Sequence, residues 1–344
     1  MMTIDLTEYL QDIEDRICPA DEEEINGGWL DFADHRNTGE FIPAPRHKVP
    51  SDLPWPHVDI NDTLEREDLA IYRELESLNQ ALSTGSNARL RVRANYGVGT
   101  LPSAFGTAVY VMPRDTDTLP NAIAIGEEGV RACIAASLPD LNDGFLGKAW
   151  RIYGRYMDIC SRYPKFSQAV YIEQPDLQGP MDVLELLWGS DLFYALYDDT
   201  DTIHEALGMI TEMIDRSIRR FYEICPDRKD TCSYFSHMDR GRLVLRDDSA
   251  MNLSPEFFSE FIAPYESGLI EKYGGIVHFC GRGDHFIERL SSYKGLHGVN
   301  ISQPHLNDME IIQKFTTDRG IHLSVSAPRG FSTEGHDVRN LVFV

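Results

Sequence analysis

The second half of the chain alternates between short apolar runs and longer amphipathic segments, and this alternation restricts the fold more than any other feature. The apolar runs are the length of buried strands, and glycines or polar turns bound them. The clearest helix between them begins at Ser254-Pro255-Glu256, where a hydroxyl cap precedes a proline at the first turn. The strand candidates are Arg242–Asp248, Ile276–Cys280, Gly298–Ser302 and Ile321–Val325. This spacing is typical of parallel crossovers, and polar residues at successive strand ends favour an α/β fold of the (β/α)8 TIM-barrel type.

The first half of the chain is less regular, and about seven strands can be identified in the whole sequence. Its strand candidates are Leu90–Tyr96, Ala122–Ile125 and Gln168–Glu173, with helices expected at 127–137, 144–163, 181–196 and 201–224. Residues 1–60 read as a polar arm with one short helix at Leu6–Ile17, followed by five closely spaced prolines that favour an extended segment. We therefore expect an N-terminal arm, 1–60, and one barrel domain, 61–344.

The stretch Tyr273–His285 carries three potential metal ligands, His278, Cys280 and His285, around a buried strand. Side chains alternate along a strand, so His278 and Cys280 point to the same side. Gly281 and Gly283 end the strand, and Asp284 is expected to cap a helix through Leu290. A histidine and a cysteine at the carboxyl end of a strand predict an active site. The alternative is that Cys280 packs as a small apolar residue and His278 makes a core hydrogen bond.

Other charged and polar residues also follow predicted strands. Because barrel strands end at one mouth, these side chains are candidates for substrate binding or acid–base work. Helix capping and loop salt bridges are the alternative for the acids, and for His322 a core hydrogen bond is the alternative. Arginines in these positions are suited to a carboxylate or phosphate. The residues are Arg93, Asn95, Glu173, Asp176, Asp247, Asp248, Arg282, His322 and Arg329.

Charge and cysteine usage limit the partners. Acidic residues outnumber basic ones, 55 against 32, which gives a formal charge of -23 and disfavours nucleic acid or an anionic membrane surface. The six cysteines show no paired spacing, which favours a reduced, cytoplasmic protein. We expect no signal peptide and no membrane span.

Five segments of the chain together resemble a known family: Gln174–Pro180, Leu187–Gly189, Leu253–Tyr265, His278–Gly281 and Gly298–Ile301. They are similar to the uroporphyrinogen decarboxylase superfamily, which also contains corrinoid-dependent methyltransferases. Asp247-Asp248 stands where that family places an acidic pair. The decarboxylases themselves share an N-terminal Arg-Gln-Ala-Gly-Arg segment that grips substrate carboxylates, and nothing like it occurs here; Pro43–Lys48 is the nearest basic cluster. The resemblance is therefore to the methyltransferase branch.

The resemblance implies a zinc site that begins with His278 and Cys280. No cysteine follows Cys280, so a third ligand has to come from His285, His322, Asp248 or Glu173. It further implies methyl transfer involving a corrinoid, on another protein or bound briefly, or a thiol acceptor, and a homodimer. Asp248 and Glu173 would then bind the substrate or a proton. The alternatives are a decarboxylase-like lyase that needs no metal and a ligand-binding barrel without catalysis.

Overall fold

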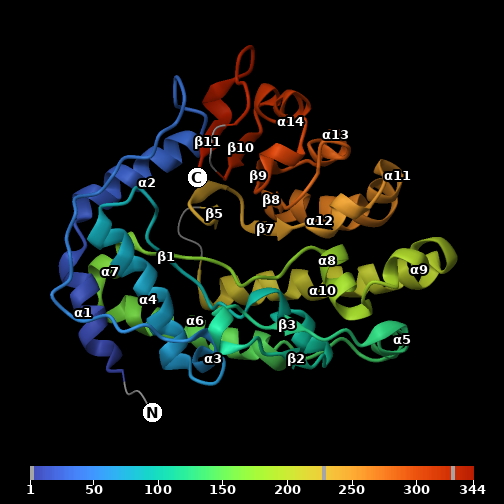
Figure 1. The fold of residues 1–344 in the computed structure, drawn as a ribbon, viewed down its shortest axis with the longest axis horizontal. Coiled ribbons are helices and arrows are strands. Elements are labelled where there is room, and N and C mark those ends of the chain that lie inside the picture. Colours follow the sequence, from blue (N-terminus) through green and yellow to red (C-terminus); the bar gives the residue numbers. More distant parts are fainter. Residues whose placement is uncertain (1–3, 227–229, 327–329) are drawn as a thin grey trace.

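The computed structural model describes residues 4–226, 230–326 and 330–344. Figure 1 shows the strands of the main parallel sheet and the helices that connect them on one side of the molecule, with the arm and most first-half helices on the other. Within the described ranges, no helix is both long and apolar enough to cross a bilayer. All six cysteines are free thiols. Arg329, one of the predicted site residues, lies outside the described residues.

The main sheet is parallel and has five strands in the order β11-β10-β9-β8-β7. Four of them are the predicted strands, and the short β11 near the end of the chain was missed. In the register of the sheet, Arg246, His278, Asn300 and Ser324 form one row across four strands. The strands are β7 Leu243–Arg246, β8 Gly275–Phe279, β9 Leu296–Ile301, β10 His322–Val325 and β11 Leu341–Phe343.

The helices that connect these strands follow the predicted order with two local differences. The segment that starts at Ser254 contains a π-helical stretch, Phe258–Ile262, just before Pro264; proline has no amide hydrogen, so the regular bonding pattern breaks here. The predicted Asp284 cap is wrong: the Asp284 carboxylate accepts from the backbone of Asp308, and the helix has only four residues. The helices are α11 Pro255–Phe257, α12 Ala263–Tyr273, α13 Ile287–Leu290 and α14 Met309–Phe315.

The first half contributes a second, two-stranded parallel sheet, β1 Arg91–Val92 and β4 Tyr171–Ile172. Both strands are shorter than predicted. Pro164 starts a helix, α7 Pro164–Ala169, and that helix takes up the first part of the predicted 168–173 strand. Next to β4, the Gln174 side chain bonds to the backbone of β7 as a neighbouring strand would. Its amide donates to Val244 O at 2.8 Å and accepts from Val244 N at 3.0 Å. This contact joins the small sheet to β7.

The hydrogen-bonded strands of the described residues do not close into an eight-stranded barrel. What they form is a mixed α/β structure with five and two parallel strands. The predicted strand Ala122–Ile125 is not part of either sheet, because β3 Asn121–Ala122 pairs antiparallel with β2 Val109–Tyr110 in a separate hairpin. The fold class is thus α/β with parallel strands, as the alternating pattern of the second half predicts.

Replacement of Gln174 by alanine is expected to lower the free energy of unfolding by about 1–3 kcal/mol, because Val244 would keep a buried backbone donor and acceptor without partners. Urea denaturation measures this change. Gln11→Ala is the matched control, since Gln11 bonds Asp15 on an exposed helix surface and surface changes usually stay within about 0.5 kcal/mol. Equal midpoints for the two variants would show that Gln174 does not join the sheets.

A second antiparallel hairpin, β5 Thr231–Tyr234 and β6 His237–Arg240, covers the face of the main sheet that carries His278. Tyr234 stacks on the His278 ring with centroids 4.5 Å apart. Gly298 of β9 leaves room for it, since a Cβ there would come within 2.8 Å of the side chains of Asp239 and His237. The hairpin was not predicted because its sequence is polar. Two of its buried polar side chains contact the sheet: His237 Nδ1 lies 2.8 Å from Ser324 Oγ, and Asp239 Oδ2 lies 2.8 Å from His322 Nδ1.

The predicted arm packs on the body, but it contains a helix that was missed. α1 Leu6–Arg16 agrees with the prediction, whereas α2 Pro19–Ala33 replaces a predicted loop. Gly27 and Gly28 lie inside α2 and obscure its pattern in the sequence. Trp29 and Phe32 of α2 are fully buried in a cluster with Met238 of β6 and Val342 of β11. The arm is therefore part of the core rather than a polar wrapping.

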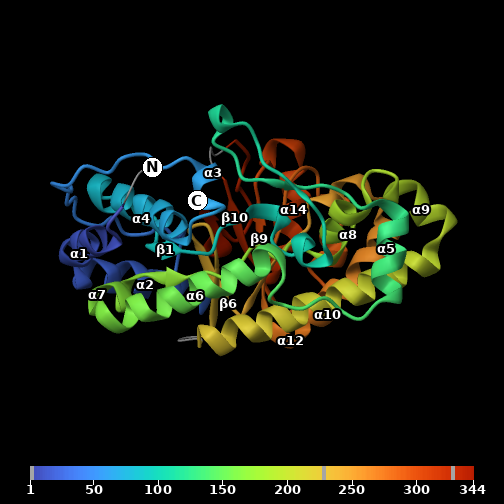
Figure 2. The same cartoon turned by 90° about the horizontal axis from the view of Figure 1, so that it is seen from below.

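The helices expected at 127–137, 144–163, 181–196 and 201–224 are present, and two further helices, α3 and α4, precede them. The expected helix 181–196 is divided in two at Gly189, which has a positive φ of 89°. In Figure 2, α10 runs under the sheet beside α12, and these two helices are in contact. These helices are α3 Ile60–Thr63, α4 Glu67–Thr84, α5 Gly126–Ala135, α6 Gly144–Arg162, α8 Pro180–Trp188, α9 Leu192–Asp198 and α10 Thr200–Ile224.

Candidate metal centre

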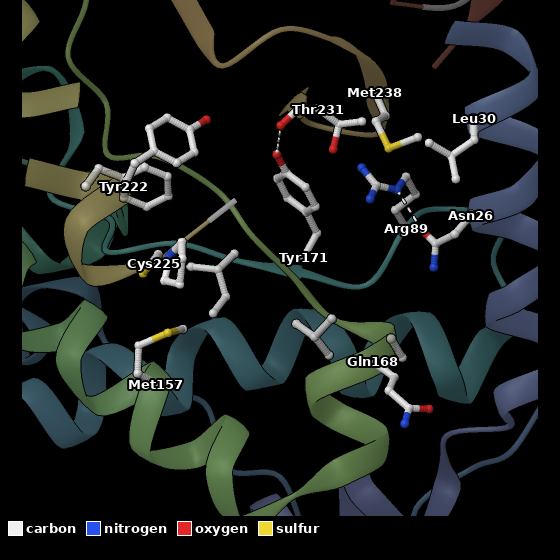
Figure 3. A pocket seen from close by; sticks show the side chains of 15 residues that line it. Asn26, Leu30, Arg89, Met157, Gln168, Tyr171, Tyr222, Cys225, Thr231 and Met238 are labelled. Atoms are coloured by element: carbon white, nitrogen blue, oxygen red, sulfur yellow. Dashed lines mark hydrogen bonds between the residues drawn. The ribbon is translucent and has the colours of Figure 1, made fainter. Parts of the chain in front are cut away.

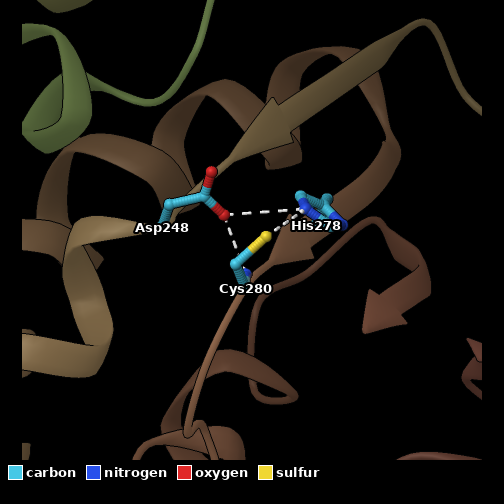
Figure 4. A group of neighbouring side chains, drawn as sticks. All are labelled: Asp248, His278 and Cys280. Atoms are coloured by element: carbon cyan, nitrogen blue, oxygen red, sulfur yellow. Dashed lines mark hydrogen bonds and ion pairs between the residues drawn. The ribbon is translucent and has the colours of Figure 1, made fainter. Parts of the chain in front are cut away.

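Three of the predicted catalytic side chains meet just beyond the carboxyl ends of β7 and β8. The Cys280 sulfur lies 3.3 Å from His278 Nε2, and the Asp248 carboxylate oxygen Oδ1 lies 3.6 Å from the same nitrogen. One nitrogen, one sulfur and one oxygen atom lie within 4.8 Å of one another. Figure 4 shows the three side chains converging from two neighbouring chain segments. Of the four candidates for a third ligand, the structure brings Asp248 to the His-x-Cys pair.

Backbone hydrogen bonds hold the two segments together. The Cys280 backbone N–H donates to Asp248 Oδ1 at 2.7 Å. The loop after β7 is held in turn by Asp182 of α8, whose carboxylate accepts from the backbone N–H groups of Asp248 and Ser249 at 2.9 and 2.7 Å. Burial, and next the charge of Asp248, raise the pKa of Asp182 to about 7. Asp182 was not among the predicted residues, although it positions one of them.

The His278 imidazole is oriented by Asn300 on the neighbouring strand β9. His278 Nδ1 lies 2.6 Å from Asn300 Oδ1, and the Asn300 amide donates to Ser324 Oγ at 2.6 Å. Since an amide oxygen only accepts, this arrangement assigns the proton to Nδ1 and leaves the Nε2 lone pair facing Cys280 and Asp248. The side chain is 2% exposed, and burial lowers the pKa of His278, which favours the neutral ring. A neutral imidazole with a fixed second nitrogen is the form that binds metals.

The environment of Cys280 favours the protonated thiol in the absence of a cation. Burial, and next the negative charge of Asp248, raise the pKa of the thiol to about 11. A bound metal ion reverses this balance, because a coordinating thiol loses its proton. The cysteine is thus unsuited to act as a free nucleophile at neutral pH and suited to act as a ligand.

Other predicted residues gather in a neighbouring small cavity rather than at the three-residue cluster. Arg93, Glu173 and Asp176 line it together with Tyr234 and Arg246. Their charges are largely matched inside the protein: Glu173 pairs with Arg91 at 2.8 Å, and Asp176 pairs with Arg246. Asn95 is half-buried, and its Oδ1 atom has no hydrogen-bond partner within the described chain. Glu173 therefore does not reach His278 as a ligand.

Four other predicted or candidate residues lie elsewhere. Arg282 is exposed and pairs with Asp284 at 2.7 Å. His322 is buried, with Nδ1 2.8 Å from Asp239 Oδ2, so the core hydrogen bond is the alternative that holds. His285 Nε2 lies 3.0 Å from the Leu253 carbonyl, away from the cluster. Asp247 is fully buried, and its carboxylate has no hydrogen-bond partner among the described residues. Alternation along the strand turns Asp247 away from the face that Asp248 uses.

Glu266 is expected to make the stability of the protein depend on pH, and burial together with its charge raises the pKa of Asp247. Burial, and next the charge of Asp182, raise the pKa of Glu266 well above its usual value, and both of its carboxylate oxygens lack partners in the described structure. A folded-state pKa above the unfolded value means that stability falls as pH rises from about 4 upward. Glu266→Gln is expected to reduce this fall by about 1 kcal/mol or more between pH 5 and 8, as one pKa unit corresponds to about 1.4 kcal/mol. Urea titrations at both pH values measure it, and parallel pH profiles would contradict it.

Several side chains that surround the cluster were not predicted from the sequence. Asn300, Tyr234 and Asp182 contact the cluster or the loops that carry it. Asn300 alone had a signal, since it is a polar residue inside the buried strand Gly298–Ser302. Tyr234 lies on the β5–β6 hairpin and Asp182 on α8. Both elements are distant from His278 in the sequence, so these contacts could not be predicted from it. The sequence could not show which residues of the neighbouring strands lie beside His278.

An open cleft of about 420 Å³ borders the cluster on the Asp248 side. Its walls come from α8, from the loop after β7 and from the β3 region, so both halves of the chain contribute. The polar groups that face it include Gln178, Asp182, Glu185, Asp248 and Asn252. Asp248 belongs to both the cluster and the cleft, and its side chain is 42% exposed. A small molecule in the cleft would therefore approach the cluster from its open side.

The described residues thus define an α/β protein whose parallel sheet carries a His/Cys/Asp cluster at its carboxyl end. A scan against protein-family models found no match, and a search of curated proteins found no relative. Among solved structures, the chain is similar to a methyltransferase from Methanosarcina mazei, with a TM-score of 0.60 and 15% identity over 90% of this chain and 84% of that chain. At this identity the likeness establishes a shared fold.

Asn300→Ala is expected to weaken zinc binding by about 10–100-fold, the usual effect of removing a group that orients a metal-binding histidine. Competition with a chromophoric chelator measures the affinity. Asn300→Asp is the matched variant: it keeps an oxygen that accepts from His278 Nδ1, so it should retain most of the affinity. Equal affinities for the alanine variant and the parent would show that Asn300 does not orient the ring.

Proposed function

We propose that this protein is a metal-dependent methyltransferase of the uroporphyrinogen decarboxylase-like type, which passes a methyl group from a corrinoid to a small thiol. The observation that supports this most is the cluster of His278, Cys280 and Asp248 beside an open cleft. The shared fold with a protein described as a methyltransferase agrees with it. We also propose that the two parallel sheets, joined by Gln174, correspond to parts of one interrupted barrel.

The donor atoms fit zinc. Imidazole nitrogen, thiolate sulfur and carboxylate oxygen are its usual ligands, and catalytic zinc sites use about three protein ligands with one position left open. No cysteine follows Cys280, and Asp248 would supply the third ligand. Zinc held by these groups would supply a Lewis acid that lowers the pKa of a substrate thiol.

The residues of this chain have separate roles in the proposal. Asn300 holds the His278 ring from one edge, and Tyr234 stacks against its face, so the Nε2 atom keeps one direction. Asp182 fixes the Asp248 loop from the cleft wall. The cleft then orients the thiol toward the cluster, while a corrinoid, carried by a partner protein, approaches from outside.

The two alternatives from the sequence receive less support. A lyase that binds a carboxylate substrate needs unpaired cations in its cavity. Arg91 and Arg246 are already paired with Glu173 and Asp176, which leaves Arg93 as the one other arginine among the described lining residues. A ligand-binding protein without catalysis would not require the His278 orientation that Asn300 provides. Both alternatives remain distinguishable by experiment.

The direct test supplies zinc-loaded protein with methylcobalamin and 2-mercaptoethanol. Loss of the methylcobalamin absorption spectrum together with formation of the methyl thioether, detected by mass spectrometry, is the expected result. Metal analysis before the reaction should find about one zinc per chain. A protein that holds no zinc and leaves methylcobalamin unchanged would contradict the proposal, and release of CO₂ from added carboxylic acids would favour the lyase instead.

A further inference from the structure

A second cavity lies at the opposite end of the strands from the metal cluster. It has a volume of about 100 Å³ and opens beside the residues that precede β1 and β4, whereas Asp248 and Cys280 follow β7 and β8. Its walls come from α2, α6, α10 and the β5–β6 hairpin. Figure 3 shows the apolar side chains around it, with one arginine at its edge. Leu30, Met157, Ile172, Phe221 and Met238 form the apolar part.

The arginine is Arg89, and it is buried without a paired carboxylate among the described residues. It is 6% exposed; its Nε donates to the Asn26 amide oxygen at 3.1 Å, and its guanidinium lies 4.7 Å from the centroid of the Tyr171 ring. In Figure 3 the terminal nitrogens point from Asn26 toward Tyr171. The buried Nη1 has no hydrogen-bond partner among the described residues. The acids whose charges act on Arg89, Glu22 and Glu173, are themselves paired with Arg46 and Arg91. A buried charge without a partner is costly, so this site favours an anion.

The shape and charge of the cavity limit the charge, chemical group and size of the anion that it can hold. Among the described lining residues Arg89 is the sole charged one, so a single negative charge balances the site. A guanidinium matches a carboxylate with two parallel hydrogen bonds, and the rest of the wall is mostly apolar. Space for a water takes about 10–15 Å³ on this measure, so the cavity holds on the order of eight non-hydrogen atoms.

We propose that this cavity binds a small apolar monocarboxylate, with its carboxylate on Arg89 and its hydrocarbon part among Leu30, Met157 and Met238. The site is separate from the proposed metal centre, and neither depends on the other. Burial lowers the pKa of Arg89, and the charges of Glu173 and Glu22, which raise it, only partly offset this effect. A carboxylate there would restore that charge balance.

Calorimetric titration of the whole protein with hexanoate tests the proposal, since hexanoate has the expected size and charge. We expect one site with a Kd below about 1 mM, a value within reach of a ligand with eight non-hydrogen atoms. 1-Hexanol, which has the same chain without the charge, should bind at least tenfold more weakly. Equal binding of the alcohol, or no binding of hexanoate, would overturn the proposal.

Two variants locate the site. Arg89→Met should weaken hexanoate binding at least tenfold, while Arg151→Met, an exposed arginine on α6, should leave it unchanged. Met157→Trp fills the opposite wall and serves as a second test if Arg89→Met does not fold. Zinc content should stay the same in all variants, which separates this result from the proposed methyl transfer. Retained binding in Met157→Trp would show that hexanoate binds elsewhere.

Discussion

Cys280→Ser is expected to abolish stoichiometric zinc binding, with a loss of affinity of at least about 100-fold. Removing a group that only orients a ligand already costs about 10–100-fold, and this change removes a ligand itself. Two remaining side chains, His278 and Asp248, fall short of the three that catalytic zinc sites use. Dialysis against a competing chelator followed by metal analysis measures the effect. Methyl transfer to a thiol should disappear with the metal.

The controls for this experiment come from the same chain. Cys133→Ser alters a half-buried thiol on α5, outside the cluster, and should leave the zinc content unchanged. His278→Ala and Asp248→Ala should resemble Cys280→Ser, since each removes one of the three donor atoms. If Asp248→Ala kept full zinc content while the other two lost it, a different group would be the third ligand. If all three kept it, the assignment of the site would be wrong.

Arg46→Leu is expected to destabilise the protein by about 3–5 kcal/mol, the usual cost of leaving one member of a buried ion pair alone. Arg46 joins the arm to the body: its Nε donates to Glu22 of α2 at 2.7 Å, and Nη1 donates to the Ser86 carbonyl. The Arg46 and Glu22 side chains are 1% and 4% exposed. Without Arg46, Glu22 must lose its charge or draw water into the core. Urea denaturation measures the loss, and proteolysis should cut the arm sooner.

A double variant and a surface control separate the buried charge from a general effect of mutation. Glu22→Leu combined with Arg46→Leu should recover much of the loss, because replacing both members of a buried pair by apolar groups is often close to neutral. Lys294→Ala breaks an exposed pair with Glu271, in which the side chains are 82% and 56% exposed, and should cost less than about 1 kcal/mol. A double variant as unstable as Arg46→Leu would mean that lost packing, not the unpaired charge, causes the effect.

The second half of the chain could be predicted closely because its signals are local. Apolar runs bounded by glycines located four strands of the main sheet, and the hydroxyl–proline start at Ser254 located the long helix. The first half could not, because its strands have only two residues each and pair over long distances. The polar β5–β6 hairpin and the glycine-containing α2 are buried by tertiary contacts, which a local sequence pattern does not predict. The short β11 was missed for the same reason.

For the site, the sequence alone determined that His278 and Cys280 share one side of a strand end, since strand alternation is a local property. It also proposed Asp248, but equally Glu173, His285 and His322. Only the tertiary structure decided among them, because which strand ends meet depends on sheet register. The same register placed Asn300 beside His278, and tertiary packing buried Asp247. Local periodicity orients a side chain relative to its own backbone, whereas its neighbours are set by the packing of distant segments.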